Sequence, residues 1–434
     1  MPGITKEPII KVGILLNNEV CFELKGSFKY RQSELEAGEY TARIENGNID
    51  TGFCRAETIE LTPLGSDATF VLKNVSIGIG FHWEQQVEQE FEGGLYLQPE
   101  NGMIRVVNHV PLEKYLKSVI SSEMSAMNDP VLLNAHAIVS RSWLLAQIFG
   151  EKNEKEKQPK PSENEIVKWY DREDHRHFDV CADDHCQRYQ GVTRVISENA
   201  QNAIDTTRGK VLMYNNEICD ARYSKCCGGI SEAFENVWQN APVPYLRPVY
   251  DKHPTATPVN MCNTPDSYFT TKPEAFCNTG DEKVLSQVLV DFDRQTQNFY
   301  RWNESFKQEE LSALIKKKSG IDFGEIIDLI PLERGYSGRI IHLKIVGAKH
   351  TLTVGKELEI RKWLSESHLY SSAFIVEKSD INNGIPGTFT LYGAGWGHGV
   401  GLCQIGAAVM SQKGYSVKEI LEHYFKGAEC KEIY

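Results

Sequence analysis

The segment from residue 111 to residue 149, PLEKYLKSVISSEMSAMNDPVLLNAHAIVSRSWLLAQIF, predicts two helices joined by a short polar turn. Apolar residues in the first half recur at steps of three and four, the period of one buried helix face. They are Leu112, Tyr115, Leu116, Val119 and Ile120. Pro111 suits a first helical position, Asp129 can cap the second helix, and Pro130 can open it.

This predicted pair carries a single carboxylate, Glu123, at the end of its first helix. A lone acid at a helix–turn junction can protonate a leaving group, whereas the alternative is a solvated carboxylate at a helix end. Asn134 and Arg141 lie seven residues apart and therefore share one face of the second helix. Trp143 occupies another face, which we expect to pack inward.

Four regions are expected along the 434 residues, a length that suits two or three domains or one large split domain. They are a strand-rich N-terminal region (1–94), a region with the helical pair and a His/Cys segment (95–250), an α+β middle module (251–385) and a Gly-rich ending with two helices (386–434). In the middle module, a helix should end at Gly320, and GRIIHLKIVG and HTLTVGKELEI should form strands. Residues 151–170 are charged and contain prolines, which is typical of an exposed loop.

Composition excludes some classes of protein. The net charge of −12 is spread along the chain, so nucleic acid is not the expected partner. No apolar run approaches 18 residues, so we expect no membrane span, and MPGITKEPIIKVGILL does not have the pattern of a signal peptide. Eleven cysteines are many for a cytosolic chain, few for a disulfide scaffold of this size, and odd in number.

The segment HRHFDVCADDHCQRYQG is a candidate metal site. Two imidazoles and two thiolates, from His175, Cys181, His185 and Cys186, are a ligand set typical of tetrahedral zinc. His177 is a competing ligand, and the alternative is a disulfide or free thiols. With four protein ligands such a zinc would be structural, because no open position remains for chemistry.

The last region contains a Gly-rich loop, GAGWGHGVG, followed by two helices, the second starting with a capping box at Ser416 and Glu419. Its G-x-G-x-G-x-G spacing matches neither a dinucleotide nor a phosphate loop. Such a loop allows close backbone approach and projects Trp396 and His398, which suits a sugar ring. The alternative is a tight structural turn with a packed tryptophan.

Three ordered motifs resemble the SpoIID/LytB family of sporulation protein D and amidase-enhancer relatives. LEKYLKSVISSEM with AHAIVSRSWLLAQ is similar to the family's LxxYLxGVVxxEM and KAQAVAARTYAL. YSKCCGGISEAFENVW…PYLRPV is similar to its GGxTxxxxxVW…PYLxxV, and GAGWGHGVGLCQIGAAVMSQKG to its GxGWGHGVGMSQxGAxxMAxxG. The resemblance covers roughly residues 95 to 430. It implies a SpoIID-like α+β fold of curved, mainly antiparallel sheets, with the helical pair carrying the catalytic glutamate.

The resemblance implies a peptidoglycan lytic transglycosylase that cuts the β-1,4 bond between N-acetylmuramic acid and N-acetylglucosamine and leaves a 1,6-anhydro end. The family's catalytic glutamate maps onto Glu123. A hydrolase normally needs two carboxylates. In this reaction the sugar's own 6-hydroxyl is the nucleophile, so one carboxyl can act as acid and then as base, given partial burial in an apolar groove.

The resemblance also implies substrate-binding roles for residues of all three motifs and the segment after the His/Cys ligands. They are Arg141, Gln187, Tyr223, Lys225, Trp396, His398 and Gln404. Alternatives are a surface salt bridge for Arg141 and loop-stabilising hydrogen bonds for His398 and Gln404. The family's KAQA is NAHA here, so its lysine becomes Asn134 and its glutamine His136, and Lys225 could supply the missing positive charge.

Two functions of different class therefore remain open. One is the enzyme that uses Glu123, with no cofactor for its chemistry and a structural zinc. The other is an amidase-enhancer-like protein that binds glycan strands or a cell-wall amidase and cuts nothing. The retained Glu123 favours the first and the altered KAQA segment the second. The resemblance implies the cell envelope, which the absence of a signal-peptide pattern leaves unexplained.

Overall fold

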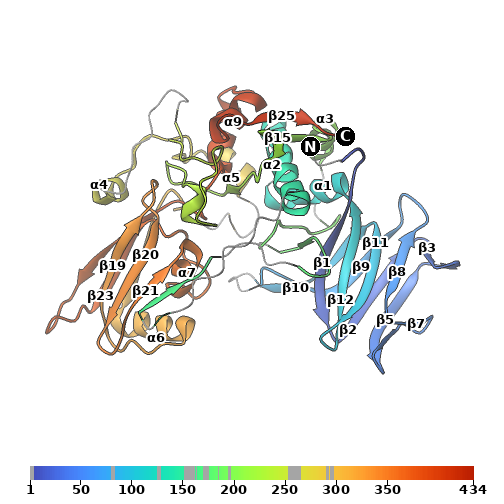
Figure 1. Ribbon diagram of the computed structural model, residues 1–434, viewed down its shortest axis with the longest axis horizontal. Coiled ribbons are helices and arrows are strands. Elements are labelled where there is room, and N and C mark those ends of the chain that lie inside the picture. Colours follow the sequence, from blue (N-terminus) through green and yellow to red (C-terminus); the bar gives the residue numbers. More distant parts are fainter. Residues whose placement is uncertain are drawn as a thin grey trace. The chain divides into compact units, whose positions relative to one another are not determined.

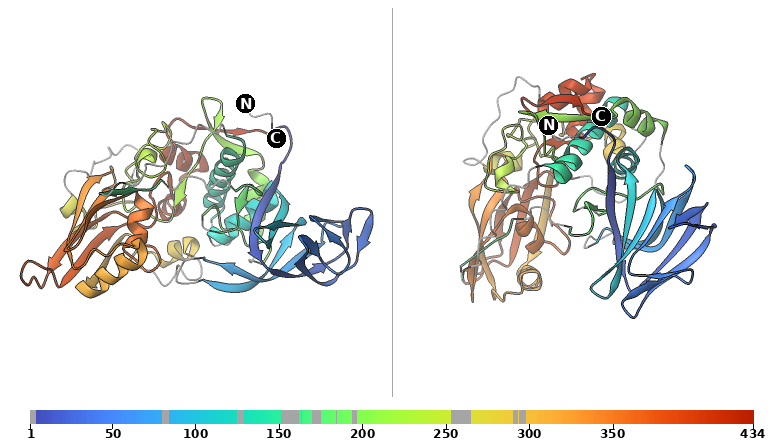
Figure 2. Two further views of the ribbon diagram at one scale, coloured as in Figure 1. Left: turned by 60° about the horizontal axis from the view of Figure 1, so that its bottom comes forward. Right: turned by 45° about the vertical axis from the view of Figure 1, so that its right-hand side comes forward.

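The computed structural model describes residues 4–79, 84–124, 129–150, 162, 164–169, 175–183, 185–193, 197–252, 265–289, 293 and 298–434. The predicted turn at 125–128 lies outside the described residues, as does most of the loop predicted at 151–170. The chain forms two compact units (Figures 1 and 2). Unit 1 comprises residues 1–149, 174–211 and 431–434, and unit 2 comprises residues 150–173 and 212–430.

Two sheets built from the alternating N-terminal segments form the β part of unit 1. The first has the order β14 (Val180–Cys181), β1 (Ile9–Asn17), β12 (Met103–Pro111), β11 (Gly94–Glu100), β8 (Ile59–Pro63), β3 (Phe28–Tyr30) and β4 (Ser33–Leu35). The second has the order β10 (Gln85–Glu92), β9 (Thr69–Ile77), β2 (Glu19–Lys25), β5 (Gly38–Glu45), β6 (Asn48–Asp50) and β7 (Arg55–Ala56). Their apolar faces pack on each other, with Phe22, Phe70 and Phe91 fully buried.

Three helices complete unit 1: α1 (Leu112–Glu123), α2 (Pro130–Phe149) and α3 (Glu198–Thr206). The predicted apolar face of α1 is confirmed, because all five of its residues are fully buried. The start of α2 is confirmed as well, since the Asp129 carboxylate accepts a hydrogen bond from the Val131 N–H at 2.9 Å. Pro111 is the last residue of β12 rather than the first of α1.

Unit 2 contains two larger sheets and one short pair of strands in its described residues. The first sheet has the order β13 (Glu165–Val167), β21 (Thr351–Gly355), β20 (Ile340–Gly347) and β19 (Ile326–Arg334). The second sheet has the order β18 (Arg301–Lys307), β23 (Thr388–Ala394) and β22 (Phe374–Ser379). The short pair consists of β17 (Tyr223–Ser224) and β24 (Leu402–Cys403). Strand β15 (Lys210–Tyr214) lies where the chain passes from unit 1 to unit 2, and it forms a hairpin with β16 (Glu217–Ile218). Strand β25 (Glu429–Glu432) lies where the chain returns to unit 1.

One apolar core joins the two larger sheets of unit 2 to their helices, with Trp302, Leu311 and Phe389 among its buried members. The helices of this unit are α4 (Pro265–Thr270), α5 (Glu282–Val288), α6 (Gln308–Ser319), α7 (Glu357–Trp363), α8 (Gln404–Gln412), α9 (Val417–Tyr424) and the short 3-10 helix Phe234–Asn236. Gly320 ends α6 in the left-handed conformation, and the capping box at Ser416 is present, both as predicted.

The expected α+β class is confirmed at the level of a mixed protein made mostly of open, curved and largely antiparallel sheets with several helices. Besides the position of Pro111, two local predictions are wrong. The strand predicted over HTLTVGKELEI ends at Gly355, and the remainder forms α7. Within the predicted loop, Glu165–Val167 forms β13, which pairs with β21 in parallel orientation. Here pairing in the folded chain overrides the local charge pattern.

Two further properties concern the described part of the chain: the length and apolar character of its helices, and the state of its cysteines. None of its helices combines the length and apolar character that a membrane crossing requires. The ten described cysteines are all free thiols.

Candidate functional site

Glu123 is the last residue of α1 and is half-buried. Its Oε1 accepts a hydrogen bond from the Arg188 N–H at 3.1 Å. Val119 and Met124, which are close to it in the sequence, are completely buried, and Trp143 of α2 is 7% exposed. Helix α1 therefore presents this carboxylate at its end, next to the segment that follows the His/Cys ligands.

Arg141 forms a buried ion pair with Glu113, three turns of helix α1 away from Glu123. Its Nη2 and Nε lie 2.6 and 3.0 Å from the two Glu113 oxygens, and the side chains are 0% and 6% exposed. Glu113 also accepts hydrogen bonds from the Tyr434 hydroxyl at 2.5 Å and the Gly209 N–H at 3.3 Å. The alternative of a surface salt bridge is wrong because the pair lies in the interior. The predicted role in substrate binding stays a prediction.

Gln187 and the two altered motif residues have partners inside unit 1. Gln187 is buried; its Oε1 accepts from the Tyr115 hydroxyl at 3.2 Å and its Nε2 donates to the Ser140 carbonyl at 3.3 Å. His136 is buried with Nδ1 3.3 Å from the Ser140 hydroxyl. The Asn134 side chain accepts from Thr206 of α3 at 3.3 Å. These contacts join the helices to one another, and the predicted substrate role of Gln187 is untested.

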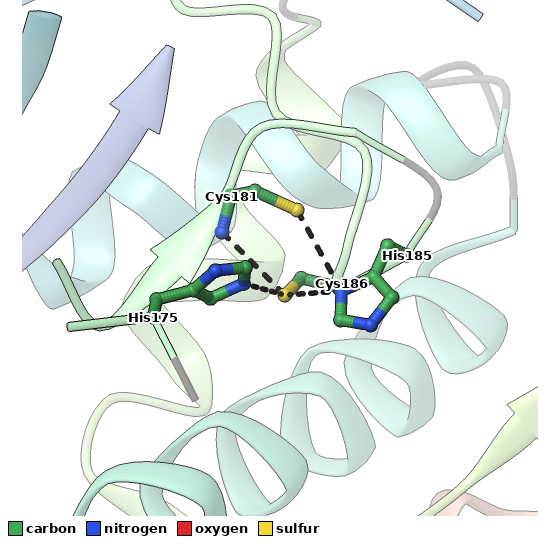
Figure 3. A group of neighbouring side chains, drawn as sticks. All are labelled: His175, Cys181, His185 and Cys186. Carbon is green, nitrogen blue, oxygen red and sulfur yellow. Dashed lines mark hydrogen bonds between the residues drawn. The ribbon is translucent and has the colours of Figure 1, made fainter. Parts of the chain in front are cut away.

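The four residues proposed as metal ligands converge in unit 1 (Figure 3). The ligand atoms of His175, Cys181, His185 and Cys186 all lie within 4.8 Å of one another. Cys186 Sγ lies 3.4 Å from His175 Nε2 and 3.5 Å from His185 Nδ1. The pKa of Cys181 is lowered far below its usual range, chiefly by its hydrogen bond with Cys186 and then by the two imidazoles. His177 is exposed and lies outside this group.

The segment that leaves this group runs along α1. The Gln190 N–H donates to Ser118 of α1 at 3.2 Å, and the buried Tyr189 hydroxyl donates to Asn108 of β12 at 2.6 Å. The Arg188 N–H, two residues after Cys186, is the donor to Glu123. The position of the His/Cys group is thus connected to that of the candidate acid through two residues of backbone, Gln187 and Arg188.

In unit 2 the Gly-Gly motif and the Gly-rich loop lie side by side. Strands β17 and β24 pair in parallel, with Ser224 opposite Cys403. Cys226 and Trp396 exchange two backbone hydrogen bonds, of 3.1 and 2.8 Å. The close backbone approach expected of the Gly-rich loop is therefore made to the chain's own second motif.

Trp396 and His398 are half-buried in this loop. The Trp396 ring meets Tyr370 edge to face at 5.8 Å. His398 Nδ1 accepts from the Val400 N–H at 3.0 Å, and the ring also bonds the backbone of Tyr223. Burial, followed by Arg222 and Arg339, holds the pKa of His398 well below its usual range, so the imidazole is neutral.

The other predicted substrate residues of unit 2 are placed as follows. Tyr223 is half-buried in β17, and Gln404 is buried at the start of α8. Lys225 forms an ion pair with Asp293 at 3.2 Å, with both side chains about nine-tenths buried. Its positive charge is therefore balanced within unit 2. Substrate roles for these residues stay predictions.

Two buried residues, Arg339 and Glu232, hold the Gly-rich loop. Arg339 lies outside the three motifs, whereas Glu232 stands at a variable position of the second motif and donates its backbone N–H to the Gly399 carbonyl at 2.8 Å. Arg339 is buried and donates to the Gly397 carbonyl at 2.9 and 3.2 Å and to the Cys227 carbonyl at 3.1 Å. Glu232 is fully buried and accepts from the Ser337 hydroxyl at 2.6 Å and the Tyr336 N–H at 3.1 Å. Only spatial proximity identifies these residues.

Gly401→Ala should destabilise unit 2 strongly. Gly401 has φ +75°, and a Cβ there would lie 2.1 Å from the Arg222 carbonyl oxygen. Gly414→Ala is the matched control, because φ is +84° and no atom lies within 4 Å of its Cβ. We expect Gly414→Ala to cost about 1 kcal/mol for the left-handed backbone, and Gly401→Ala about 1–3 kcal/mol more for the clash. Urea denaturation checks this, and equal costs would contradict the packing described.

The chain is similar to known proteins both at the level of a family profile and at the level of individual relatives. The profile of the Stage II sporulation protein family, SpoIID, matches residues 100–214, and a domain of unknown function (DUF8618) matches residues 232–401. The first match contains both helices of the candidate site and the His/Cys group.

Three relatives illustrate the similarity. Stage II sporulation protein D of Bacillus subtilis (strain 168) is 25% identical over 328 residues, 75% of this chain and 76% of that protein. An uncharacterised protein of Brachyspira hyodysenteriae (strain ATCC 49526 / WA1) is 27% identical over 340 residues, 78% of this chain and 72% of that protein. The amidase enhancer of Bacillus subtilis (strain 168) is 26% identical over 247 residues, 53% of this chain but only 32% of that protein.

The helical pair and the His/Cys group lie in the part of the chain that the SpoIID family profile matches. Over a longer stretch the chain is similar to sporulation protein D and to an amidase enhancer.

Proposed function

We propose that this protein is a peptidoglycan lytic transglycosylase in which Glu123 is the general acid and then the general base. The family profile and the similarity to sporulation protein D and an amidase enhancer support a role related to the cell wall. The observation that carries the finer proposal is the half-buried Glu123 carboxylate at the end of α1, held by the Arg188 N–H. A carboxyl in such a place can be both positioned and reached by substrate.

The proposed reaction needs one carboxyl and no water. Glu123 donates its proton to the glycosidic oxygen as the bond from that oxygen to C1 of the N-acetylmuramic acid breaks. The resulting carboxylate takes the proton of the 6-hydroxyl of the same sugar, whose oxygen bonds to C1 and closes the 1,6-anhydro ring. Glu123 ends protonated, as it began, so the proton count balances.

For unit 2 by itself we also propose that residues of the second and third motifs bind glycan. The Trp396 ring would supply an apolar stacking face, and the Tyr223 and Gln404 side chains polar contacts. In unit 1, the buried Arg141 and Gln187 connect α1 to α2, and their contact with the sugar stays a prediction.

The test is the product of purified protein on glycan strands, with and without stem peptides, followed by mass spectrometry. We expect chains that end in 1,6-anhydro-N-acetylmuramic acid. Products with reducing ends formed by water would show a hydrolase, and no cleavage of either substrate would remove the enzymatic proposal.

An amidase-enhancer-like binding role is the second candidate, favoured by one observation. Asn134 stands where the family's lysine is expected, and it is bonded to Thr206 of α3. The corresponding cation is therefore absent from that face of α2. Binding to glycan strands or to a cell-wall amidase without cleavage, and without any effect of Glu123→Gln on that binding, would support this candidate.

We also propose a structural zinc at the His/Cys group, because the four donors are of the right kind and close enough to share one ion. Its four protein ligands would leave no position for chemistry, so its effect on Glu123 would be indirect, through residues 187–190.

Cys186→Ser should lower the zinc content of the purified protein by one equivalent and loosen that segment. We expect amide hydrogen exchange at Arg188 and Gln190 to quicken by at least about tenfold, since metal-supporting groups are worth 10–100-fold in affinity. Cys21→Ser, at another half-buried free thiol of unit 1, is the control. Unchanged zinc content and exchange in Cys186→Ser would refute this site.

A further inference from the structure

A second group of possible metal ligands lies in unit 2, apart from every residue given a role above. It consists of Cys227, Asp251, Cys277 and Cys403, whose ligand atoms all lie within 4.8 Å of one another. All four side chains are buried, at 2%, 0%, 0% and 0% exposure. The four cysteine and aspartate positions are far apart in the sequence, so no spacing motif reveals them.

The distances within this group suit one small ion. Cys227 and Cys277 have their sulfur atoms 3.7 Å apart. Zinc–sulfur bonds of about 2.3 Å at tetrahedral angles place two thiolates about 3.8 Å apart. The Cys227 N–H donates to Cys403 Sγ at 3.2 Å, which is the kind of hydrogen bond that stabilises a thiolate.

Two hydrogen bonds fix the orientation of the Asp251 carboxylate, as expected of a metal ligand. Its Oδ2 accepts from the Cys277 N–H at 2.8 Å, and its Oδ1 accepts from the Tyr424 hydroxyl at 2.6 Å. Both partners are neutral groups. A carboxylate buried this completely is stable when it faces a cation or coordinates a metal, and outer hydrogen bonds of this type aim ligating carboxylates.

We propose that Cys227, Asp251, Cys277 and Cys403 bind a second structural zinc ion. Three soft thiolates and one carboxylate select zinc over magnesium or calcium, which prefer oxygen. Four protein ligands close the coordination sphere, so the ion is structural. This inference is independent of the proposed lytic activity.

The ion joins segments that carry the second and third motifs. Cys227 belongs to the Gly-Gly motif, and Cys403 ends β24 at the foot of the Gly-rich loop. Asp251 and Cys277 come from chain segments between these motifs and are joined to each other by a backbone hydrogen bond from Phe276 to Asp251. The zinc therefore holds the Gly-Gly motif together with the Gly-rich loop, which carries Trp396.

The first test is metal content of the full chain, measured by inductively coupled plasma mass spectrometry after gel filtration. Cys277→Ser should lower zinc by one equivalent, both in the otherwise unchanged protein and in a Cys181→Ser/Cys186→Ser background that lacks the first group. Cys219→Ser is the matched control, because Cys219 is a buried free thiol of the same unit outside the group. It should leave the zinc content unchanged.

A second variant, with a smaller structural change, tests the proposal even if a serine variant does not fold. Asp251→Asn retains all thiols and nearly the same volume. It should release zinc to a chromogenic chelator at least about tenfold faster than the unchanged protein, since even supporting groups of metal sites are worth 10–100-fold in affinity. The proposal is overturned by an equal zinc content in Cys277→Ser and Cys219→Ser, by unchanged release from Asp251→Asn, or by a Cys227–Cys277 disulfide in protein prepared without oxygen.

Discussion

Replacing Glu123 by glutamine should reduce the release of 1,6-anhydro products by at least about 100-fold, because a positioned acid or base contributes about 10²–10⁴ to rate. Glutamine keeps the size of the side chain and can still accept the Arg188 N–H hydrogen bond seen at 3.1 Å. It can neither donate the first proton nor accept the second. The loss should therefore appear in turnover, with little change in glycan binding.

Glu88→Gln is the control for this variant, since Glu88 is an exposed residue of β10 in the same unit. It makes the same chemical change without touching the candidate site, and it should retain full activity. Mass spectrometry of the soluble products measures both variants. Full activity in Glu123→Gln would show that another residue carries the chemistry.

Replacing Arg141 by methionine should lower the free energy of unfolding by about 3–5 kcal/mol, which is the usual cost of removing one partner of a buried ion pair. Methionine fills similar space but leaves the Glu113 carboxylate with only the Tyr434 hydroxyl and the Gly209 N–H. Helices α1 and α2 lose one of the contacts that join them, so urea denaturation should shift to a clearly lower midpoint.

Two further variants separate the charge effect from packing. Arg141→Met combined with Glu113→Leu removes both charges, and we expect it to recover much of the lost stability, because an apolar pair can replace a buried ion pair. Arg43→Met breaks the exposed pair of Arg43 with Glu19 in the same unit and should leave the midpoint unchanged. If Arg141→Met also left it unchanged, the buried pair would have no stabilising role in solution.

Much of the fold was predictable because its signals are local. The period of α1, the Asp129 cap of α2, the left-handed Gly320 after α6 and the capping box at Ser416 each depend on residues within one or two turns. Local signals failed where pairing partners decided the outcome. Glu165–Val167 has a loop-like sequence but gains a strand partner in β21.

The residues of the candidate site also divide into those that a local sequence pattern predicts and those that it does not. Glu123 and the four His/Cys ligands could be named because each stands in a short, recognisable motif, and the four ligands do converge. The partner of Arg141 could not be named, since Glu113 lies on another helix. Cys403 has no other cysteine near it in the sequence, yet it lies beside Cys227 in the folded chain.

The sequence by itself determined the helical pair, most of the strands and the resemblance to a family, because periodicity, caps and ordered motifs are properties of neighbouring residues. Only the tertiary structure decided what Arg141 contacts, what the Gly-rich loop approaches, and which cysteines share a site with Asp251. These contacts join residues far apart along the chain. Their distances depend on how sheets and helices pack, which no local pattern encodes.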